Sequence, residues 1–237
     1  GNIRMLAYRY TNWLSDFNSN VSQEAVKVFI DKGAFTDKNL IPIYNGIDLN
    51  KFKYQEVKKI STIITLLAVG RFNEQKDYPN LLKALALVIK KYQNIHLNIA
   101  GDGELRSDIE DLIKQLNLSE YITLLGRRND IPVLMQQADF FILPSKYEGF
   151  GLVVAEAMAC STFVIATDCG GVKEVMGETG ILVSPQNSQA LANAIIHAIE
   201  LSKDEVLENN QHAMQHVQRN FDLNKIIDQW GQIYESK

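Results

Sequence analysis

Short apolar runs alternate with amphipathic stretches through most of this chain. The runs are rich in β-branched and aromatic residues and are bounded by turn-forming residues, which is typical of buried strands. We expect strands at 63–69, 95–100, 121–125, 139–143, 163–166 and 181–183. Helical spacing of apolar residues predicts helices at 80–92, 104–116, 132–137, 152–160 and 188–201. This order predicts an α/β fold with a doubly wound parallel sheet and helices on both faces.

The first residues carry a smaller pattern of the same kind. We expect strands at 17–22 and 40–44, with an amphipathic helix over 25–30 between them. Ser22 is placed to cap that helix, and Gly33 to stop it. Asn45-Gly46 is a turn signal. A strand and helix of this size cannot cover their own apolar faces, so this unit needs neighbours.

Glycines follow several of the predicted strands. Gly70, Gly101 and Gly126 each come after a strand, and so does the turn that begins at Glu148. Parallel sheets bind ligands beyond the carboxyl ends of their strands. We therefore expect these segments to line one edge of the sheet and to form a single ligand site.

The run from Glu148 to Glu156 is the most informative segment. An apolar strand ends at Pro144, two glycines allow a tight turn, and a helix is expected from Leu152 to Cys160. The start of a helix offers free backbone N–H groups to an anion or a sugar hydroxyl. The two carboxylates are eight residues apart, one at the turn and one about two turns further on. They are suited to two different parts of one long ligand.

This run resembles the E-x7-E signature of retaining glycosyltransferases with the GT-B fold, specifically glycosyltransferase family 4. Other segments resemble that family in the same order, from about Val21 to the C-terminus: Val69-Gly70-Arg71-Phe72 with Lys76, Ile99-Ala100-Gly101-Asp102-Gly103, Gly126-Arg127, Met158-Ala159-Cys160, and Gly170-Gly171 with Glu174. The chain departs from the family at Asp77 and Ser161, where glycine is usual, and at Phe163, where proline is usual.

The resemblance implies a domain organisation. Residues 1–45 would be a remnant of the N-terminal, acceptor-side domain and its linker. Residues 46–220 would be a Rossmann-like domain that binds a nucleotide-sugar donor, and 221–237 a C-terminal helix that packs back toward the domain junction. The chain is then expected to be a truncated enzyme that binds its donor and shows no transfer by itself. Contacts to the acceptor, a sugar or a lipid-linked glycan, would belong to the missing domain.

The resemblance also implies roles for individual residues. Arg71 and Lys76 would hold the diphosphate and stabilise its charge as it leaves, and Glu148 would hold hydroxyls of the transferred sugar as the third catalytic residue. Glu156 would accept hydrogen bonds from the ribose. The base would stack near Gly126 and Arg127. The expected donor-binding residues are Gly70, Arg127, Gly149, Phe150, Gly151, Leu152 and Glu156.

Simpler structural explanations exist for these motifs. Arg71 and Lys76 could be surface cations of a solvated turn. Gly170 and Gly171, with Glu174, either shape the loop beside the donor or merely permit a turn. Gly101-Asp102-Gly103 resembles the start of a dinucleotide fingerprint, but Arg106 replaces its third glycine, which argues against a dehydrogenase.

Composition excludes several classes of protein. Of 237 residues, 46% are hydrophobic and 22% charged, which is ordinary for a globular protein, and the net charge of -4 argues against nucleic-acid binding. No apolar run reaches the length of a membrane span, and no signal-peptide layout opens the chain. Cys160 and Cys169 are expected to be free thiols in a reducing cytoplasm. The expected location is cytoplasmic, with peripheral association of the full enzyme at the inner membrane face left open.

No metal or other cofactor is expected. The chain contains no Asp-x-Asp, the motif with which glycosyltransferases of the other main fold hold a metal against the diphosphate. His212 and His216 are four residues apart on a probable helix, but no third ligand accompanies them, so a solvated helix face is the expected explanation.

The resemblance implies transfer of a sugar from a nucleotide sugar to an acceptor hydroxyl with retention of anomeric configuration, in polysaccharide or glycoconjugate synthesis. UDP is the first expectation for the nucleotide, and GDP is the second. Two alternatives stay open: a stand-alone nucleotide-sugar binding module without transfer activity, and an epimerase or phosphorylase of the same fold.

Overall fold

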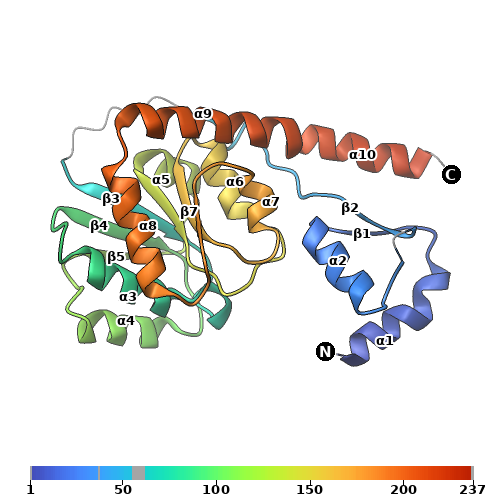
Figure 1. Cartoon of the computed structure of the whole chain (residues 1–237), viewed down its shortest axis with the longest axis horizontal. Coiled ribbons are helices and arrows are strands. Elements are labelled where there is room, and N and C mark those ends of the chain that lie inside the picture. The colour runs from blue at the N-terminus through green and yellow to red at the C-terminus, as the bar shows by residue number, and fades with distance from the viewer. Residues whose placement is uncertain (1, 37, 55–61, 236–237) are drawn as a thin grey trace.

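The main body of the molecule is a six-stranded parallel sheet (Figure 1). The computed structural model describes residues 2–36, 38–54 and 62–235. The chain enters at the middle strand, winds outward on one side, returns to the middle and winds outward on the other, in the order β5-β4-β3-β6-β7-β8. The strands are β3 (Ile64–Val69), β4 (Ile95–Ala100), β5 (Ile122–Gly126), β6 (Phe140–Leu143), β7 (Phe163–Thr167) and β8 (Ile181–Val183). The predicted doubly wound sheet is confirmed, and each strand end is within one residue of its predicted position.

Helices cover both faces of this sheet. They are α3 (Tyr78–Val88), α4 (Arg106–Gln115), α5 (Ile131–Gln137), α6 (Leu152–Ala159), α7 (Val172–Met176), α8 (Ser188–Glu200) and α9 (Lys203–Asn220). Buried side chains of α3, α4 and α8 share one core cluster, and those of α5, α6, α7 and α9 share the other. Helix α3 ends earlier than predicted, because the chain turns after Val88 to enter β4. Helix α7 was not predicted, since the two glycines before it suggested only a turn.

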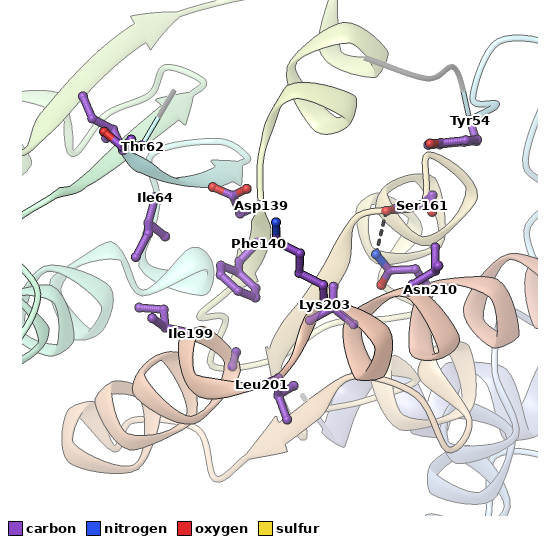
Figure 2. A pocket seen from close by; sticks show the side chains of 14 residues that line it. Tyr54, Thr62, Ile64, Asp139, Phe140, Ser161, Ile199, Leu201, Lys203 and Asn210 are labelled. Atoms are coloured by element: carbon purple, nitrogen blue, oxygen red, sulfur yellow. Dashed lines mark hydrogen bonds between the residues drawn. The ribbon is translucent and has the colours of Figure 1, made fainter. Parts of the chain in front are cut away.

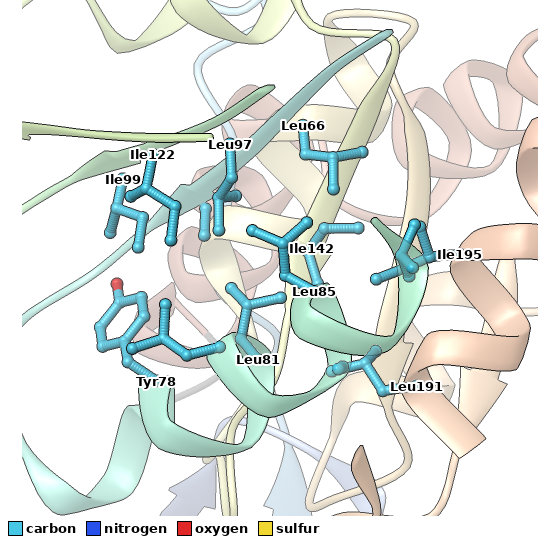
Figure 3. Packing of buried hydrophobic residues seen from close by; sticks show 14 of the residues in the cluster. Leu66, Tyr78, Leu81, Leu85, Leu97, Ile99, Ile122, Ile142, Leu191 and Ile195 are labelled. Carbon is cyan, nitrogen blue, oxygen red and sulfur yellow. The ribbon is translucent and has the colours of Figure 1, made fainter. Parts of the chain in front are cut away.

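The two cores follow from the alternation of side chains along the strands. In β3, Leu66 lies in one cluster and Leu67 in the other. Figure 3 shows Leu81 of α3 among the residues of the first cluster, with Leu191 of α8 beside α3. Burying a leucine of this kind contributes about 1.5–3 kcal/mol. This packing fixes the strand ends from which the functional loops leave.

The start of the chain forms a separate small unit. Strands β1 (Asn18–Asn20) and β2 (Leu40–Pro42) pair in parallel, with α2 (Gln23–Asp31) between them. Helix α1 (Asn2–Thr11) and a 3-10 turn, η1 (Asn12–Leu14), precede them and were not predicted. The predicted strands are present but shorter, and Ser22 caps α2 as predicted by accepting a hydrogen bond from the Ala25 N–H at 3.1 Å.

The turn predicted at Asn45-Gly46 is wrong. The chain runs on without a turn to Ile47, whose N–H donates to the Phe221 carbonyl at 2.7 Å. A Cβ added at Gly46 would lie 2.6 Å from the Cα of Leu223. Glycine is therefore required here for the close approach of two chain segments.

The last two helices connect the main sheet with the small unit. Figure 1 shows α9 and α10 (Leu223–Glu235) running end to end, from the six-stranded sheet to the side of β1 and β2. The rings of Trp230 in α10 and Phe17 near β1 are 6.3 Å apart. The expected C-terminal helix is present over Leu223–Glu235, and in it Ile226 is buried whereas Ile227 is 56% exposed. Helix α9 thus packs on the main sheet, and α10 reaches the β1–α2–β2 unit.

Candidate functional site

The candidate site lies where the winding of the sheet reverses. Strands β3 and β6 are neighbours, but the chain leaves them toward opposite sides. The loops after such strands diverge and leave a crevice at the carboxyl edge, where ligands of doubly wound sheets bind. Here the loop after β3 holds Gly70 to Lys76, and the loop after β6 leads to Gly151. The Lys146 N–H donates to the Gln75 carbonyl at 2.8 Å and joins the two loops.

An ion pair bridges these two loops. The Lys76 Nζ lies 2.6 Å from Glu148 Oε1, and the side chains are only 16% and 10% exposed. The buried Ser145 hydroxyl donates to the same oxygen at 2.9 Å, and Gln75 Nε2 lies 3.4 Å from the other. The structure therefore brings together two of the three predicted catalytic residues. A phosphate could take over the charge of Lys76, and hydroxyls could donate to Glu148.

Gly70 makes this arrangement possible. A Cβ there would lie 2.9 Å from Lys76 Cε, so glycine lets the lysine side chain lie across the end of β3. The Tyr78 hydroxyl donates to the Gly70 carbonyl at 3.1 Å. Burial, with Glu148 nearby, raises the pKa of Tyr78 and keeps this donor protonated. A Cβ at Gly101 would lie 1.8 Å from the Gly70 oxygen, so these two strand ends also meet without spare room.

The glycine turn leads directly into α6. Gly151 has φ +91°, a conformation that side chains disfavour, and it is the N-cap of the helix. Among the described residues, nothing accepts a hydrogen bond from the N–H groups of residues 150 to 153. The Phe150 ring is buried, 5.8 Å from Tyr44 and 5.2 Å from Phe221. The ring anchors the turn, while the helix start provides donors and positive potential for a ligand.

Glu156 occupies a different environment from Glu148. It is partly buried and is the one ionisable residue of α6. Burial raises its pKa to about 7, against the opposing positive charge of Lys51. No described residue donates a hydrogen bond to its carboxylate. Helix α6 begins at Leu152 as predicted, so Glu156 lies just over one turn into the helix. The division of the two carboxylates between separate surroundings agrees with the prediction.

The two arginines lie outside this centre. Arg71 is 71% exposed and pairs with Glu104, with its guanidinium 3.2 Å from Oε2. The structure thus holds Arg71 against Glu104 and does not bring it to the Lys76–Glu148 pair. Arg127 is exposed after β5, an edge strand two positions from β3, and follows Gly126 at φ +65°. Leu152, 41% exposed at the first position of α6, is on the glycine turn with Gly149.

The two positions at which glycine was expected have left-handed backbones. Asp77 has φ +45° and Ser161 has φ +61°. An L-residue pays about 1–2 kcal/mol in this conformation, which explains why glycine suits both positions. Asp77 immediately follows Lys76, is buried, and its burial raises the pKa of the carboxyl.

Sequence reasoning missed several residues around the site. Ser145 directly follows the buried strand and Pro144, and a polar residue there could have been suspected. Gln75 and Tyr44 carry no such signal. Glu174 was left between two explanations, and the structure shows a third: its carboxylate accepts hydrogen bonds from the N-terminus of α2, at Gln23 N–H (2.8 Å) and Glu24 N–H (2.7 Å).

A cavity of about 550 Å³ lies at the opposite, amino edge of the sheet (Figure 2). Phe140, at the first position of β6, lines it together with Ile199 and Leu201. Its polar contacts include the hydrogen bond from Asn210 Nδ2 to the Ser161 carbonyl at 2.8 Å. None of the predicted site residues lines this cavity.

The histidines and cysteines add no metal site. No cluster of three or more His, Cys, Asp or Glu side chains suited to a metal ion occurs among the described residues. His212 is exposed as expected, but the solvated face is wrong for His216, which packs 5.4 Å from the Phe221 ring. Cys160 and Cys169 are free and buried, and burial raises the pKa of the Cys160 thiol to about 12.

The helices give no sign of a membrane crossing. In the described part of the chain, none combines the length and the apolar composition that spanning a bilayer requires.

Residues 50–215 match the family described as Glycosyl transferases group 1. N-acetyl-alpha-D-glucosaminyl L-malate synthase of Bacillus anthracis is 29% identical over 209 residues, which cover 84% of this chain and 54% of the relative. The chain spans about half the length of the relatives it matches.

Two solved structures extend the comparison. Alr3699/HepE of Anabaena, solved with UDP and glucose, has a TM-score of 0.89 at 26% identity, covering 100% of this chain and 68% of that one. The C-terminal domain of a Francisella tularensis group 1 glycosyl transferase (LpcC) has a TM-score of 0.66 at 25% identity, covering 75% of this chain and 100% of that one. The α/β sheet described above is therefore the Rossmann-like sheet of GT-B glycosyltransferases.

Proposed function

The chain belongs to the Glycosyl transferases group 1 family, and we propose that it binds the nucleotide-sugar donor of a retaining transfer reaction of the GT4 type. The observation that carries the proposal is the Lys76–Glu148 ion pair across the crevice, beside a helix start with unused N–H donors. The cation suits the diphosphate of the donor. The carboxylate and the backbone N–H groups suit the hydroxyls of its sugar. Since the chain covers about half of its relatives, the activity of the whole protein is part of this proposal.

Lys76 exchanges its pairing with Glu148 for a pairing with the diphosphate. Arg71, with five N–H donors and an exposed position, turns from Glu104 to the same group. In the reaction, the bond between the anomeric carbon and the diphosphate oxygen breaks, and the acceptor oxygen bonds to that carbon on the same face. The hydroxyl proton leaves with the diphosphate. Lys76 and Arg71 stabilise the negative charge that develops on this leaving group.

The two carboxylates bind opposite ends of the donor. Glu148, held by Ser145, accepts hydrogen bonds from hydroxyls of the transferred sugar. The N–H groups of Phe150 and Gly151 place that sugar. Glu156 accepts the ribose hydroxyls, and these donors replace the water that its burial excludes. The base lies near Gly126 and Arg127, after β5.

UDP is the proposed nucleotide, with GDP as the second candidate. The Anabaena structure, which holds UDP and glucose and covers the whole of this chain, supports the first choice. We further propose that binding needs no divalent metal, because Lys76, Arg71 and the start of α6 supply positive potential. Residues 46–220 are the donor-binding domain in this proposal, and 1–45 belong to the lobe that faces it.

The transfer reaction is proposed to build a polysaccharide or glycoconjugate. Its acceptor would be a sugar or a lipid-linked glycan.

Calorimetric titration of UDP and GDP into this chain, in the presence of EDTA, tests the proposal. We expect UDP to bind more tightly than GDP, and added magnesium to change its affinity by less than about twofold. A protein that binds neither nucleotide would refute donor binding. Binding that appears only with magnesium would refute the metal-free charge scheme.

A further inference from the structure

Glu174 lies outside the crevice, yet its carboxylate accepts three hydrogen bonds. Its two oxygens accept the backbone N–H groups of Gln23 and Glu24, and the Tyr44 hydroxyl lies 3.2 Å from Oε2. Gln23 and Glu24 are the first residues of α2, about 150 positions away in the sequence. A carboxylate at a helix N-terminus is stabilised both by these donors and by the helix dipole. Glu174 therefore fastens α2 to the main sheet.

Ser22 continues this connection into the glycine turn. Its side chain is fully buried, and its hydroxyl donates to the Gly149 carbonyl at 3.1 Å. A hydroxyl has one proton to donate, so this bond is its single donor interaction. Gly149 stands between Glu148 and Phe150, which are assigned to the transferred sugar. The peptide group between Gly149 and Phe150 is thus held from behind by α2.

The three segments meet without spare space. A Cβ added at Gly170 would lie 1.7 Å from the Glu148 carbonyl oxygen. One added at Gly171 would lie 2.8 Å from Ser22 Cβ and 2.9 Å from the Gly149 oxygen. A shift of α2 relative to the glycine turn would therefore displace the backbone at Glu148 and Gly149.

We infer that Glu174 is a positioning residue for the sugar end of the donor site. It holds the N-terminus of α2 in the place from which Ser22 fixes the Gly149–Phe150 peptide. The β1–α2–β2 unit thereby sets the sugar-binding turn without touching the nucleotide. This inference rests on the proposed function for its ligand, and on the three contacting segments for its geometry.

Three variants separate this role from a general loss of stability. Glu174→Gln removes the charge and one acceptor oxygen, and Ser22→Ala removes the donor to Gly149 together with the acceptor that caps α2. Glu178→Gln is the matched control, since it removes the same charge from an exposed side chain four residues away. UDP and UDP-glucose are titrated into each protein, and the amide spectra of the ligand-free proteins are recorded by NMR.

The inference predicts that Glu174→Gln and Ser22→Ala lower UDP-glucose affinity by about 5- to 10-fold and UDP affinity by less than about twofold. In the ligand-free spectra, the Phe150 amide resonance moves in both variants and stays in place in the control. Equal weakening of both ligands would overturn the inference, as would unchanged binding of both.

The spectra of the ligand-free proteins test the link from Glu174 to Phe150 independently of the proposed function. A wild-type protein that binds neither ligand would refute donor binding, while the Phe150 shift would still test the link from Glu174. If Glu174→Gln moved only resonances around α2 and α7, the inference would be wrong even with donor binding intact.

Discussion

The two edges of the six-stranded sheet are built from the same strands but differ in chemistry. At the carboxyl edge, glycines bring the loops close together, and a charged pair is 10–16% exposed in the crevice between β3 and β6. At the amino edge, the same two strands border a cavity of about 550 Å³ whose lining includes Phe140, Ile199 and Leu201. Asp139 and Lys203 also line this cavity, so charge by itself does not distinguish the two edges. The unused N–H donors at the start of α6, beside the buried Lys76–Glu148 pair, therefore assign the ligand to the carboxyl edge.

The largest expected difference between the two edges is in UDP affinity after substitution of a lysine at each of them. Lys76→Met removes the cation assigned to the diphosphate and leaves Glu148 as an unbalanced negative charge. We expect UDP affinity to fall by roughly 10- to 100-fold, which corresponds to the loss of a charge-assisted contact of about 1.5–3 kcal/mol. Calorimetry measures the change.

Lys203→Met is the matched control, because Lys203 lines the amino-edge cavity. Its UDP affinity should stay within about twofold of wild type. Comparable losses in the two variants would mean that net charge, rather than position, governs binding.

The next effect concerns pH. With a folded pKa of about 7, Glu156 is largely protonated at pH 6 and largely ionised at pH 8. The ribose hydroxyls donate to the ionised form, so UDP affinity should rise with pH across this window. The phosphate of UDP titrates near pH 6 and contributes the same trend in any variant. Glu156→Gln should bind UDP about 5- to 10-fold more weakly at pH 8 and lose the additional pH dependence. Parallel pH profiles of the two proteins would contradict the ribose assignment.

The same residue predicts a stability effect of defined sign. Glu156 has a raised folded pKa, so between about 4.5 and about 7 the folded state binds more protons than the unfolded state. Its contribution to stability is therefore lost as pH rises through this window. Urea denaturation of wild type and Glu156→Gln at pH 5 and pH 8 should show the variant gaining relative stability at pH 8. A gain at pH 5 instead would reverse the sign and exclude burial as the cause.

A second variant at the amino edge makes the comparison sharper. Asn210→Ala removes the hydrogen bond to the Ser161 carbonyl beside the cavity. We expect the free energy of unfolding to fall by about 1 kcal/mol, with unchanged UDP affinity. Denaturation and calorimetry on one sample provide both values. Weakened UDP binding in this variant would show that the amino edge also belongs to the ligand site.

The smallest expected effect is at Ser161. Glycine should relieve its left-handed backbone, offset in part by the greater freedom of the unfolded chain, for a net gain of about 0.5 kcal/mol. Ser188→Gly, at the first position of α8, is the control and should lower stability. A loss in Ser161→Gly would mean that its side chain contributes more than its backbone costs.

The sequence predicted the main sheet well and the small unit less well. Strands such as β4 and β6 are apolar runs between turn signals, so both their order and ends could be read. Helix α1 has no such boundaries. The Asn45-Gly46 turn failed because the need for Gly46 comes from Leu223, which is remote in sequence.

The candidate site was predictable where it depended on local spacing. Glu148, the glycine turn and Lys76 follow strand ends, and the topology brings strand ends together. The pairing of Arg71 with Glu104 and the attachment of Glu174 to α2 could not be predicted, because they depend on side-chain contacts between distant segments. Neither alternative raised for Glu174 from sequence included a helix N-terminus as its partner.

Hydrogen exchange with and without UDP tests the central claim most directly. The account predicts that UDP slows exchange in peptides covering residues 70–77 and 145–156, and leaves peptides covering 198–210 unchanged. Protection at 198–210 without protection at the two loops would contradict it, because the ligand would then lie at the amino edge of the sheet.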